Sequence, residues 1–275
     1  AASGCIGAFL GVESGNPQIL KEIRKPGTAE IFIEAANMLR KYEQINTRIL
    51  LMIGFPGETV KMLFDTIHLA EKMNSDWCNI TILQPWKSTP IYDQMVEEGL
   101  LGEGLEGDLK RDDNMFAPYT LGPYSRQRSI ERGSLKVKDE MEKVFKNLKP
   151  DDIPSPEELD NIWFYMNYRL NFQRLFRENR LIKIEQQWKF LKYIHTLTAP
   201  DNALVMYFYG YIQKQLFDEI DLNLIDKFEK RLAESSYWAE RMNILGLSAD
   251  DLRNGQFPVA VSNTAETEKN LVFSI

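Results

Sequence analysis

The sequence predicts an α/β fold of about three parallel strand–helix units, followed by an all-α helical C-terminal domain. In the first hundred residues, short apolar runs alternate with amphipathic stretches, a pattern typical of a parallel sheet or barrel covered by helices. After residue 156 the chain reads as successive helices with short breaks, which are typical of antiparallel helices in a bundle. The 275 residues suffice for one large domain or two modest ones.

Three apolar runs predict the strands of the first part. They are short and show little alternation, which indicates burial on both faces of a parallel sheet. The predicted strands are residues 5–12, 48–53 and 77–83, and the helices between and after them are 28–42, 59–73 and 88–100. The apolar face of the first helix is predicted as Phe32, Ala35, Leu39 and Tyr42, and that of the second as Leu63, Ile67 and Ala70.

The rest of the chain divides into a connecting segment and a helical region. Glycine, proline and charged residues dominate up to residue 150, with one helix candidate at 133–148. The later helices are predicted at 157–178, 182–197, 201–219 and 223–242. The predicted domains are therefore 1–102, a linker or return segment at 103–150, and a helical domain at 151–275. An aromatic stripe in the first of these helices indicates bundle core, or else a wall over a large, flat or lipidic substrate; it comprises Phe164, Tyr168, Phe172 and Phe176.

Composition narrows the function classes. The net charge of −7 argues against nucleic acid as the main ligand, and no apolar run is long enough to span a membrane. Cys5 and Cys78 form neither a disulfide framework nor a metal-ligand spacing, so we expect both to be small buried side chains in a cytoplasmic protein. His68 is expected at a surface or edge, and His195 as a packed or capping residue. The chain starts at Ala1, without a methionine, and an apolar run already begins at its fifth residue. We therefore expect a fragment of a longer protein.

Polar or glycine-rich sequences follow each predicted strand. They are "GVESG" at 11–15, "GFPGET" at 54–59 and "QPWKSTP" at 84–90. Each alone is consistent with simple turn chemistry. Ligands of parallel α/β folds collect at the carboxyl ends of strands, however, and glycine lets the backbone approach a ligand closely. Together the three sequences predict a ligand site.

The stretches "GVESGNPQILKEIRKPGT", "LLMIGFPGET" and "ILQPWKSTPIYDQMVEEGLL", in this order, closely resemble the second half of a radical S-adenosylmethionine (SAM) core. The nearest group is the cobalamin-binding-domain radical SAM proteins, related to the anaerobic magnesium-protoporphyrin cyclase. The resemblance covers about residues 1–102 and implies a partial (β/α) barrel. It implies an enzyme that uses SAM and a [4Fe–4S] cluster, together with cobalamin in this group. Such an enzyme generates a 5′-deoxyadenosyl radical or transfers a methyl group to a small-molecule substrate, with a reductant protein as partner.

The resemblance also implies roles for matching residues. Glu13, with Ser14 beside it, would hydrogen-bond the ribose of SAM, and Lys25 would pair with its methionine carboxylate. Met52 would contact adenine, with Gly54 allowing close approach. The backbone at the end of the third strand would also contact adenine, through Leu83, Gln84 and Pro85. Where some relatives carry a ribose-binding aspartate in the second strand, this chain has Leu50.

The cluster motif of this family, three cysteines as C-x3-C-x2-C, is not present in the chain, which has two cysteines in all. We therefore expect the cluster ligands upstream, no metal site here, and an inactive fragment whose catalytic residues stay unassigned. Two other functions remain open. The helical region could be a protein-interaction module, or the chain could be another α/β enzyme that binds phosphate at "GFPGET" on the N-terminus of the next helix. Glu58 argues against the second, because its charge repels phosphate.

Overall fold

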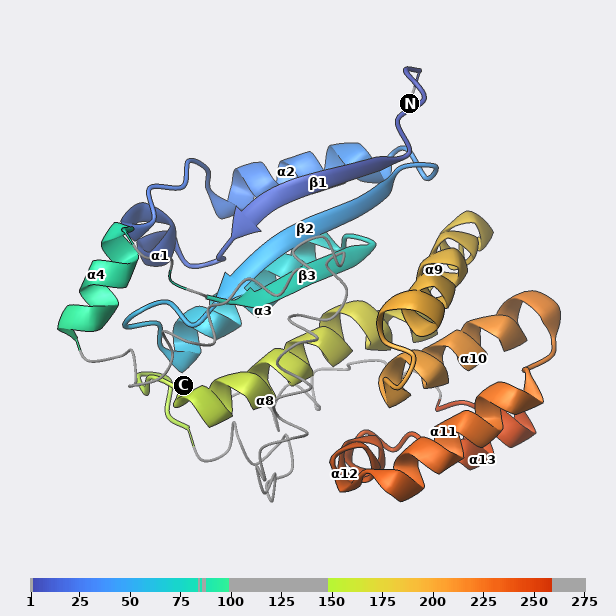
Figure 1. Ribbon diagram of the computed structural model, residues 1–275. Helices are drawn as coiled ribbons and strands as arrows, with labels where there is room; N and C mark the ends of the chain where they lie inside the picture. The colour runs from blue at the N-terminus through green and yellow to red at the C-terminus, as the bar shows by residue number, and fades with distance from the viewer. Residues whose placement is uncertain (1, 84, 86–87, 99–147, 259–275) are drawn as a thin grey trace.

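The computed structural model describes residues 2–83, 85, 88–98 and 148–258. The helix predicted at 133–148 lies almost entirely outside these ranges, as does most of the predicted linker. The described residues form a three-stranded parallel sheet with helices on one side, followed by a helical region, as the sequence predicts (Figure 1).

The sheet has the strand order β1-β2-β3, and all pairs are parallel. Its strands are β1 (Gly7–Glu13), β2 (Asn46–Ile53) and β3 (Trp77–Ile82). The first helices are α1 (Pro17–Glu22), which the sequence analysis missed, α2 (Ala29–Arg40), α3 (Val60–Met73) and α4 (Pro90–Glu97). Each helix starts at a side chain that accepts a backbone N–H, and these caps are Asn16, Thr28, Thr59 and Thr89.

One face of β2 is fully buried, whereas Val12 is the only buried residue of β1, which corrects the expectation of burial on both faces for these two strands. Helices α2 and α3 lie behind the sheet in Figure 1, and β2 alternates between fully and partly buried residues. Ile49, Leu51 and Ile53 lie on the fully buried face. The predicted inward face of α3 is confirmed, whereas that of α2 is shifted: Ala36 is buried and Tyr42 is exposed beyond the end of the helix.

The helical region follows the predicted order with finer breaks. It comprises α8 (Pro156–Asn167), a π-helical turn (Tyr168–Phe172), a 3₁₀ turn (Gln173–Arg177), α9 (Leu181–Tyr193), a second π-helical turn (Ile194–Thr198), α10 (Ala203–Phe217), α11 (Leu222–Glu234), α12 (Ser236–Ile244) and α13 (Ala249–Asn254). The helix predicted at 223–242 is interrupted at Ser235, whose hydroxyl caps α12. The aromatic stripe is bundle core. Phe172 and Phe176 pack on Phe208 of α10 with ring centroids 5.2 and 5.0 Å apart.

Side chains of the helical region cover the outer edge of β3. The side-chain amide of Asn171 accepts from Cys78 N (2.7 Å) and donates to Cys78 O (2.9 Å), as a neighbouring strand would. The indole N–H of Trp163 donates to Ile80 O (2.8 Å). At the amino ends of the strands, Lys183 of α9 forms a buried ion pair with Asp76 (2.7 Å). The sheet and the helical region are therefore joined along one edge and at the amino ends of the strands.

Candidate functional site

The carboxyl end of β1 contains a bulge that redirects the side chain of Glu13. The pairing register with β2 shifts between Gly11 and Glu13, and Glu13 has a φ of 68°, which is uncommon for a residue with a side chain. The Glu13 carboxylate lies 3.1 Å from the point where a Cβ on Gly11 would be. The bulge thus aims Glu13 at the face of the sheet opposite α2 and α3. A strained residue at a strand end is typical of functional sites.

Glu13 and Lys25 form an ion pair at this strand end. The Lys25 Nζ lies 3.1 Å from Glu13 Oε1, and the two side chains are 28% and 23% exposed. A side chain at position 11 would come within 2.9 Å of Lys25 Nζ, so Gly11 leaves the room in which the pair forms. The residues predicted for ribose and for the methionine carboxylate are therefore neighbours, and both keep access to solvent.

Ser14, the other predicted ribose residue, is committed to the turn after β1. It is fully buried, and its hydroxyl contacts Thr66 Oγ1 (3.2 Å) and accepts from Asn16 N (3.1 Å). Gly15 N donates to the same threonine hydroxyl (2.9 Å). A Cβ on Gly15 would lie 2.6 Å from Thr66 Cα, so only glycine lets α3 pack this closely. The "ESGN" turn is thus explained by helix packing, apart from Glu13.

On β2, Met52 is partly buried and shares the open face with Leu50, whose register partners are Gly11 and Asn79. Gly54 has a φ of 84°, and a Cβ there would lie 2.6 Å from Leu159 Cδ2 of α8. The close approach predicted at Gly54 is therefore made by Leu159 in this structure. The role of Met52 toward adenine stays a prediction.

The end of β3 offers few backbone donors. Leu83 N donates to Ile53 O (2.8 Å), and Pro85, which is buried, has no N–H. Gln84 lies outside the described residues. Neither Leu83 nor Pro85 therefore offers a free backbone N–H to a ligand at this strand end.

The turn after β2 is filled by its own carboxylate. Glu58 is buried and accepts from Gly54 N (2.6 Å) and Phe55 N (3.2 Å). Burial raises the pKa of Glu58 to about 7, although the two backbone hydrogen bonds act to lower it. Glu58 thus occupies two N–H groups of the turn, and the first N–H groups of α3, on Val60 and Lys61, donate to Asp152 O (3.0 Å) and Pro150 O (2.9 Å). These backbone donors are therefore not available to a phosphate.

Asn79 is a candidate that the sequence analysis missed. It pairs in register with Leu50 on the open face of the sheet, and it is 5% exposed. Neither its side-chain oxygen nor its nitrogen has a hydrogen-bond partner among the described residues, which is costly for a buried amide. A polar residue inside the apolar run "WCNITIL" is the signal that could have identified it.

The two cysteines differ in position. Cys78 is buried as predicted, and burial raises the pKa of its thiol to about 12. Cys5 is exposed and precedes β1, which corrects the expectation that it is buried in a strand. In the part of the chain that the structure describes, no three His, Cys, Asp or Glu side chains gather into a group that could hold a metal ion. None of the helices in this part is long and apolar enough to cross a membrane.

Comparisons with known proteins agree with the first part of the chain. Residues 1–70 match the model of the radical SAM superfamily. The chain is 32% identical over 98 residues to an uncharacterised methyltransferase of Pyrococcus horikoshii. The aligned segment covers 36% of this chain and 21% of that protein. It is 34% identical over 99 residues (35% of this chain, 22% of the relative) to the tRNA-2-methylthio-N(6)-dimethylallyladenosine synthase of Ehrlichia canis. The same synthase of Vibrio cholerae is 31% identical over 143 residues, or 48% of this chain and 29% of that protein.

These matches support the radical SAM family for the N-terminal part of the chain. The chain spans only about a fifth of the length of the first two relatives. Their names alone therefore do not establish its activity.

Proposed function

We propose that this chain is part of a radical SAM enzyme and that the carboxyl ends of β1 to β3 hold SAM. The observation that carries the proposal is the Glu13–Lys25 pair, turned onto the open face of the sheet by a bulge at positive φ. This pair lies inside the segment that matches the radical SAM model.

The charges of the pair suit the two polar ends of SAM. A carboxylate accepts hydrogen bonds from two ribose hydroxyls, and an ammonium attracts the methionine carboxylate. In the proposed complex, Glu13 and Lys25 exchange their mutual contact for these two ligand groups. Met52 would then contact the adenine ring from the same face of the sheet. When bound to a reduced [4Fe–4S] cluster, SAM supplies a 5′-deoxyadenosyl radical.

The residues present do not fit the cluster itself. Two cysteines cannot supply three thiolates, and Cys78 is buried with a raised thiol pKa, which opposes the thiolate that ligates iron. We propose that the cluster ligands belong to another part of the protein, so that this chain alone is inactive.

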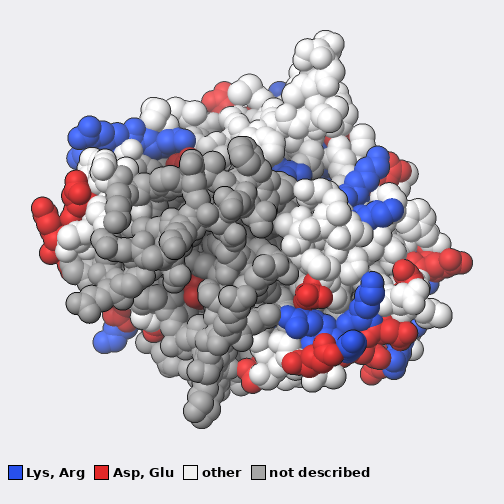
Figure 2. All heavy atoms as spheres, in the orientation of Figure 1, with Lys and Arg blue, Asp and Glu red and all other residues white. Residues whose placement is uncertain are grey.

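For the whole enzyme we propose radical formation or methyl transfer on a small-molecule substrate, with a reductant protein as partner and with cobalamin in a further domain. The name of the Pyrococcus relative supports methyl transfer. The names of the other two relatives raise tRNA as a second substrate class. The chain's net charge of −7 disfavours tRNA as a substrate. On the face of the molecule drawn in Figure 2, the described basic side chains are interspersed with acidic ones.

Two ligands test the site in the 275-residue chain. SAM carries the carboxylate, whereas 5′-methylthioadenosine keeps adenine and ribose without it. In equilibrium dialysis, Glu13→Ala should weaken both ligands about ten- to a hundredfold, since a charge-assisted hydrogen bond contributes roughly 1.5–3 kcal/mol. Glu13→Gln should lose less. Lys25→Ala should weaken only SAM.

Lys21→Ala is the matched control, because Lys21 is exposed on α1 and lies outside the pair. It should bind both ligands as the unmodified chain does. If Glu13→Ala binds SAM with unchanged affinity, Glu13 is only a turn residue and the proposed site is wrong.

Other functions have less support. The phosphate site at "GFPGET" is opposed by Glu58, which occupies the turn's N–H groups. An interaction module would need an exposed apolar groove on the bundle, but the aromatic stripe of α8 and its following turns packs inward against α10 and α12.

A further inference from the structure

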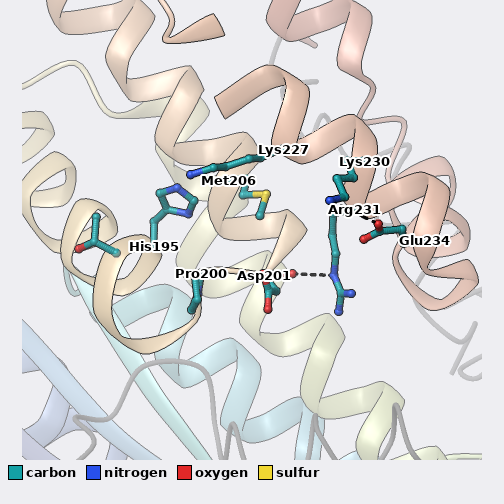
Figure 3. A pocket seen from close by; sticks show the side chains of 9 residues that line it. His195, Pro200, Asp201, Met206, Lys227, Lys230, Arg231 and Glu234 are labelled. Atoms are coloured by element: carbon teal, nitrogen blue, oxygen red, sulfur yellow. Dashed lines mark hydrogen bonds and ion pairs between the residues drawn. The ribbon is translucent and has the colours of Figure 1, made fainter. Parts of the chain in front are cut away.

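A pocket of about 460 Å³ lies in the helical region, and none of its lining residues belongs to β1, β2 or β3 (Figure 3). Its walls come from the π-helical turn Ile194–Thr198, the turn that follows it, and helices α10 and α11. The lining residues are His195, Thr196, Pro200, Asp201, Met206, Lys227, Lys230, Arg231 and Glu234. Its volume is in the range of small-molecule sites.

His195 provides a buried polar group in this wall. The residue is 9% exposed, its ring lies 5.6 Å from that of Tyr209, and its Nδ1 has no hydrogen-bond partner among the residues described. Burial lowers the pKa of His195, and Lys227 lowers it further, while Asp201 and Asp221 oppose the shift. The shift favours the neutral imidazole, which has one N–H to donate and one nitrogen to accept.

Basic side chains from α11 complete the wall. Figure 3 shows Lys227 extending toward the imidazole of His195, while Lys230, Arg231 and Glu234 lie at the other end of the pocket. Lys227 has no ion pair or hydrogen bond among the described residues, and it lies beside the imidazole of His195. The pocket is lined by three cationic side chains and two carboxylates, which gives it a formal net charge of +1. The net charge of the whole chain is −7.

The carboxylates of the pocket offset part of this positive charge. Glu234 Oε1 lies 3.7 Å from Lys230 Nζ, and Arg231 Nε donates to the backbone oxygen of Asp201 (2.9 Å). The carboxylates of Asp201 and Asp221 act electrostatically on His195, whereas neither forms an ion pair with Lys227 among the described residues.

We propose that this pocket binds the phosphate group of a small phosphorylated molecule. Phosphate oxygens accept several hydrogen bonds, and the ammonium of Lys227 and the N–H of the His195 ring offer donors at the same end of the pocket. The pocket is much larger than an inorganic phosphate, and Pro200 and Met206 add apolar surface for an organic part. The site is independent of the proposed SAM site.

Nuclear magnetic resonance of the imidazole groups tests the proposal, because the chain has only two histidines. His68 is exposed on α3 and serves as an internal control. The signals of His195, assigned with His195→Gln, are followed at pH 7.5 during titration with inorganic phosphate, glycerol 3-phosphate and acetate. We expect saturable shifts of His195 with both phosphate compounds, without matching shifts of His68. Tighter binding of glycerol 3-phosphate would identify a phosphomonoester as the ligand class.

Lys227→Gln should weaken phosphate binding about tenfold or more, since it removes the charge-assisted hydrogen bond that the ammonium donates to the phosphate. Because Lys227 is exposed, the substitution should leave the core of the helical region intact. Lys61→Gln, an exposed lysine of α3 outside the pocket, is the matched control and should bind as before. SAM affinity should be unchanged by Lys227→Gln, which separates this proposal from the previous one. Absence of a His195 shift with either phosphate compound, equal shifts with acetate, or unchanged binding in Lys227→Gln would each overturn it.

Discussion

The ion pair between Lys183 and Asp76 gives a quantitative test of how the helical region is held to the sheet. Both side chains are 4% exposed, and Lys183 Nζ lies 2.7 Å from Asp76 Oδ2 and 2.8 Å from Ile45 O. The same carboxylate oxygen accepts from the backbone N (2.7 Å) and the hydroxyl (2.9 Å) of Thr47. The buried carboxylate of Asp76, which directly precedes β3, therefore links Lys183 of α9 to Thr47 of β2.

Lys183→Met keeps the length of the side chain and removes its charge. The buried Asp76 carboxylate then loses the ammonium that it contacts and keeps electrostatic attraction from Arg48 and Arg180. Breaking a buried pair in this way costs about 3–5 kcal/mol. Domains are commonly stable by about 5–15 kcal/mol, so the variant should lose a large share of its stability. Removing the charge of Asp76 as well, in Lys183→Met/Asp76→Asn, should recover part of the loss, because no unpaired charge remains buried.

Urea denaturation followed by circular dichroism measures the free energy of unfolding of each variant. Lys189→Met is the matched control, since Lys189 is exposed on the same helix. It should change stability by less than about 0.5 kcal/mol. A loss below about 1 kcal/mol in Lys183→Met, or no recovery in the double variant, would refute the assignment of this pair as a buried link.

Two further predictions concern turns near the strand ends. Gly15→Ala should destabilise the chain by roughly 1–3 kcal/mol in thermal or urea unfolding, because the new Cβ would meet the backbone of α3, whereas Gly7→Ala, with 3.6 Å to its nearest neighbour, should cost less. Glu58 has a pKa raised by burial from 4.5 to about 7, so its folded form keeps a proton that the unfolded form releases. Its stabilising effect is therefore fully present below pH 4.5 and is lost as the pH rises to 7, by at most about 3 kcal/mol. Glu58→Gln should remove this part of the pH dependence in urea titrations between pH 4.5 and 8, and Glu34→Gln on the exposed side of α2 should not.

Local patterns predict the elements well where a single helix or strand carries the signal. The three strands, α3 and the sequence of C-terminal helices follow from apolar periodicity and polar breaks. Periodicity could not reveal the short helix α1, because it depends on Asn16, whose side chain caps the helix and contacts Asp65 of α3 (2.8 Å). It also could not show that Ser235 divides one predicted helix into two, since the break is set by a capping hydroxyl.

The candidate site depends on contacts that a linear sequence does not contain. Spacing suggests that Glu13 and Lys25 belong to one turn region, but only the bulge of β1 explains how they meet on one face. Ser14 lies next to Glu13 in the sequence, as expected of a second ribose residue. Its hydroxyl, however, is hydrogen-bonded to the hydroxyl of Thr66, which is distant along the chain. Gly54 similarly accommodates Leu159 of a helix that is more than a hundred residues away.

The two edges of the sheet differ in a way that bears on the proposed barrel. At one edge, Asn171 pairs with the backbone N–H and C=O of Cys78 in β3. At the other edge, β1 has no strand beyond it among the described residues, and Phe9 is exposed there. Helix α2 exposes Ile31 and Met38, which lie seven residues apart on one stripe of the helix. An open strand edge with apolar side chains on the adjacent helix gains free energy when it is covered, at about 25 cal/mol per Å² of apolar surface. One more strand–helix unit would cover the edge and the stripe together, whereas a helix alone would leave the N–H and C=O groups of β1 unpaired. The exposed surface therefore favours a sheet that extends beyond β1, which is what the proposed barrel requires.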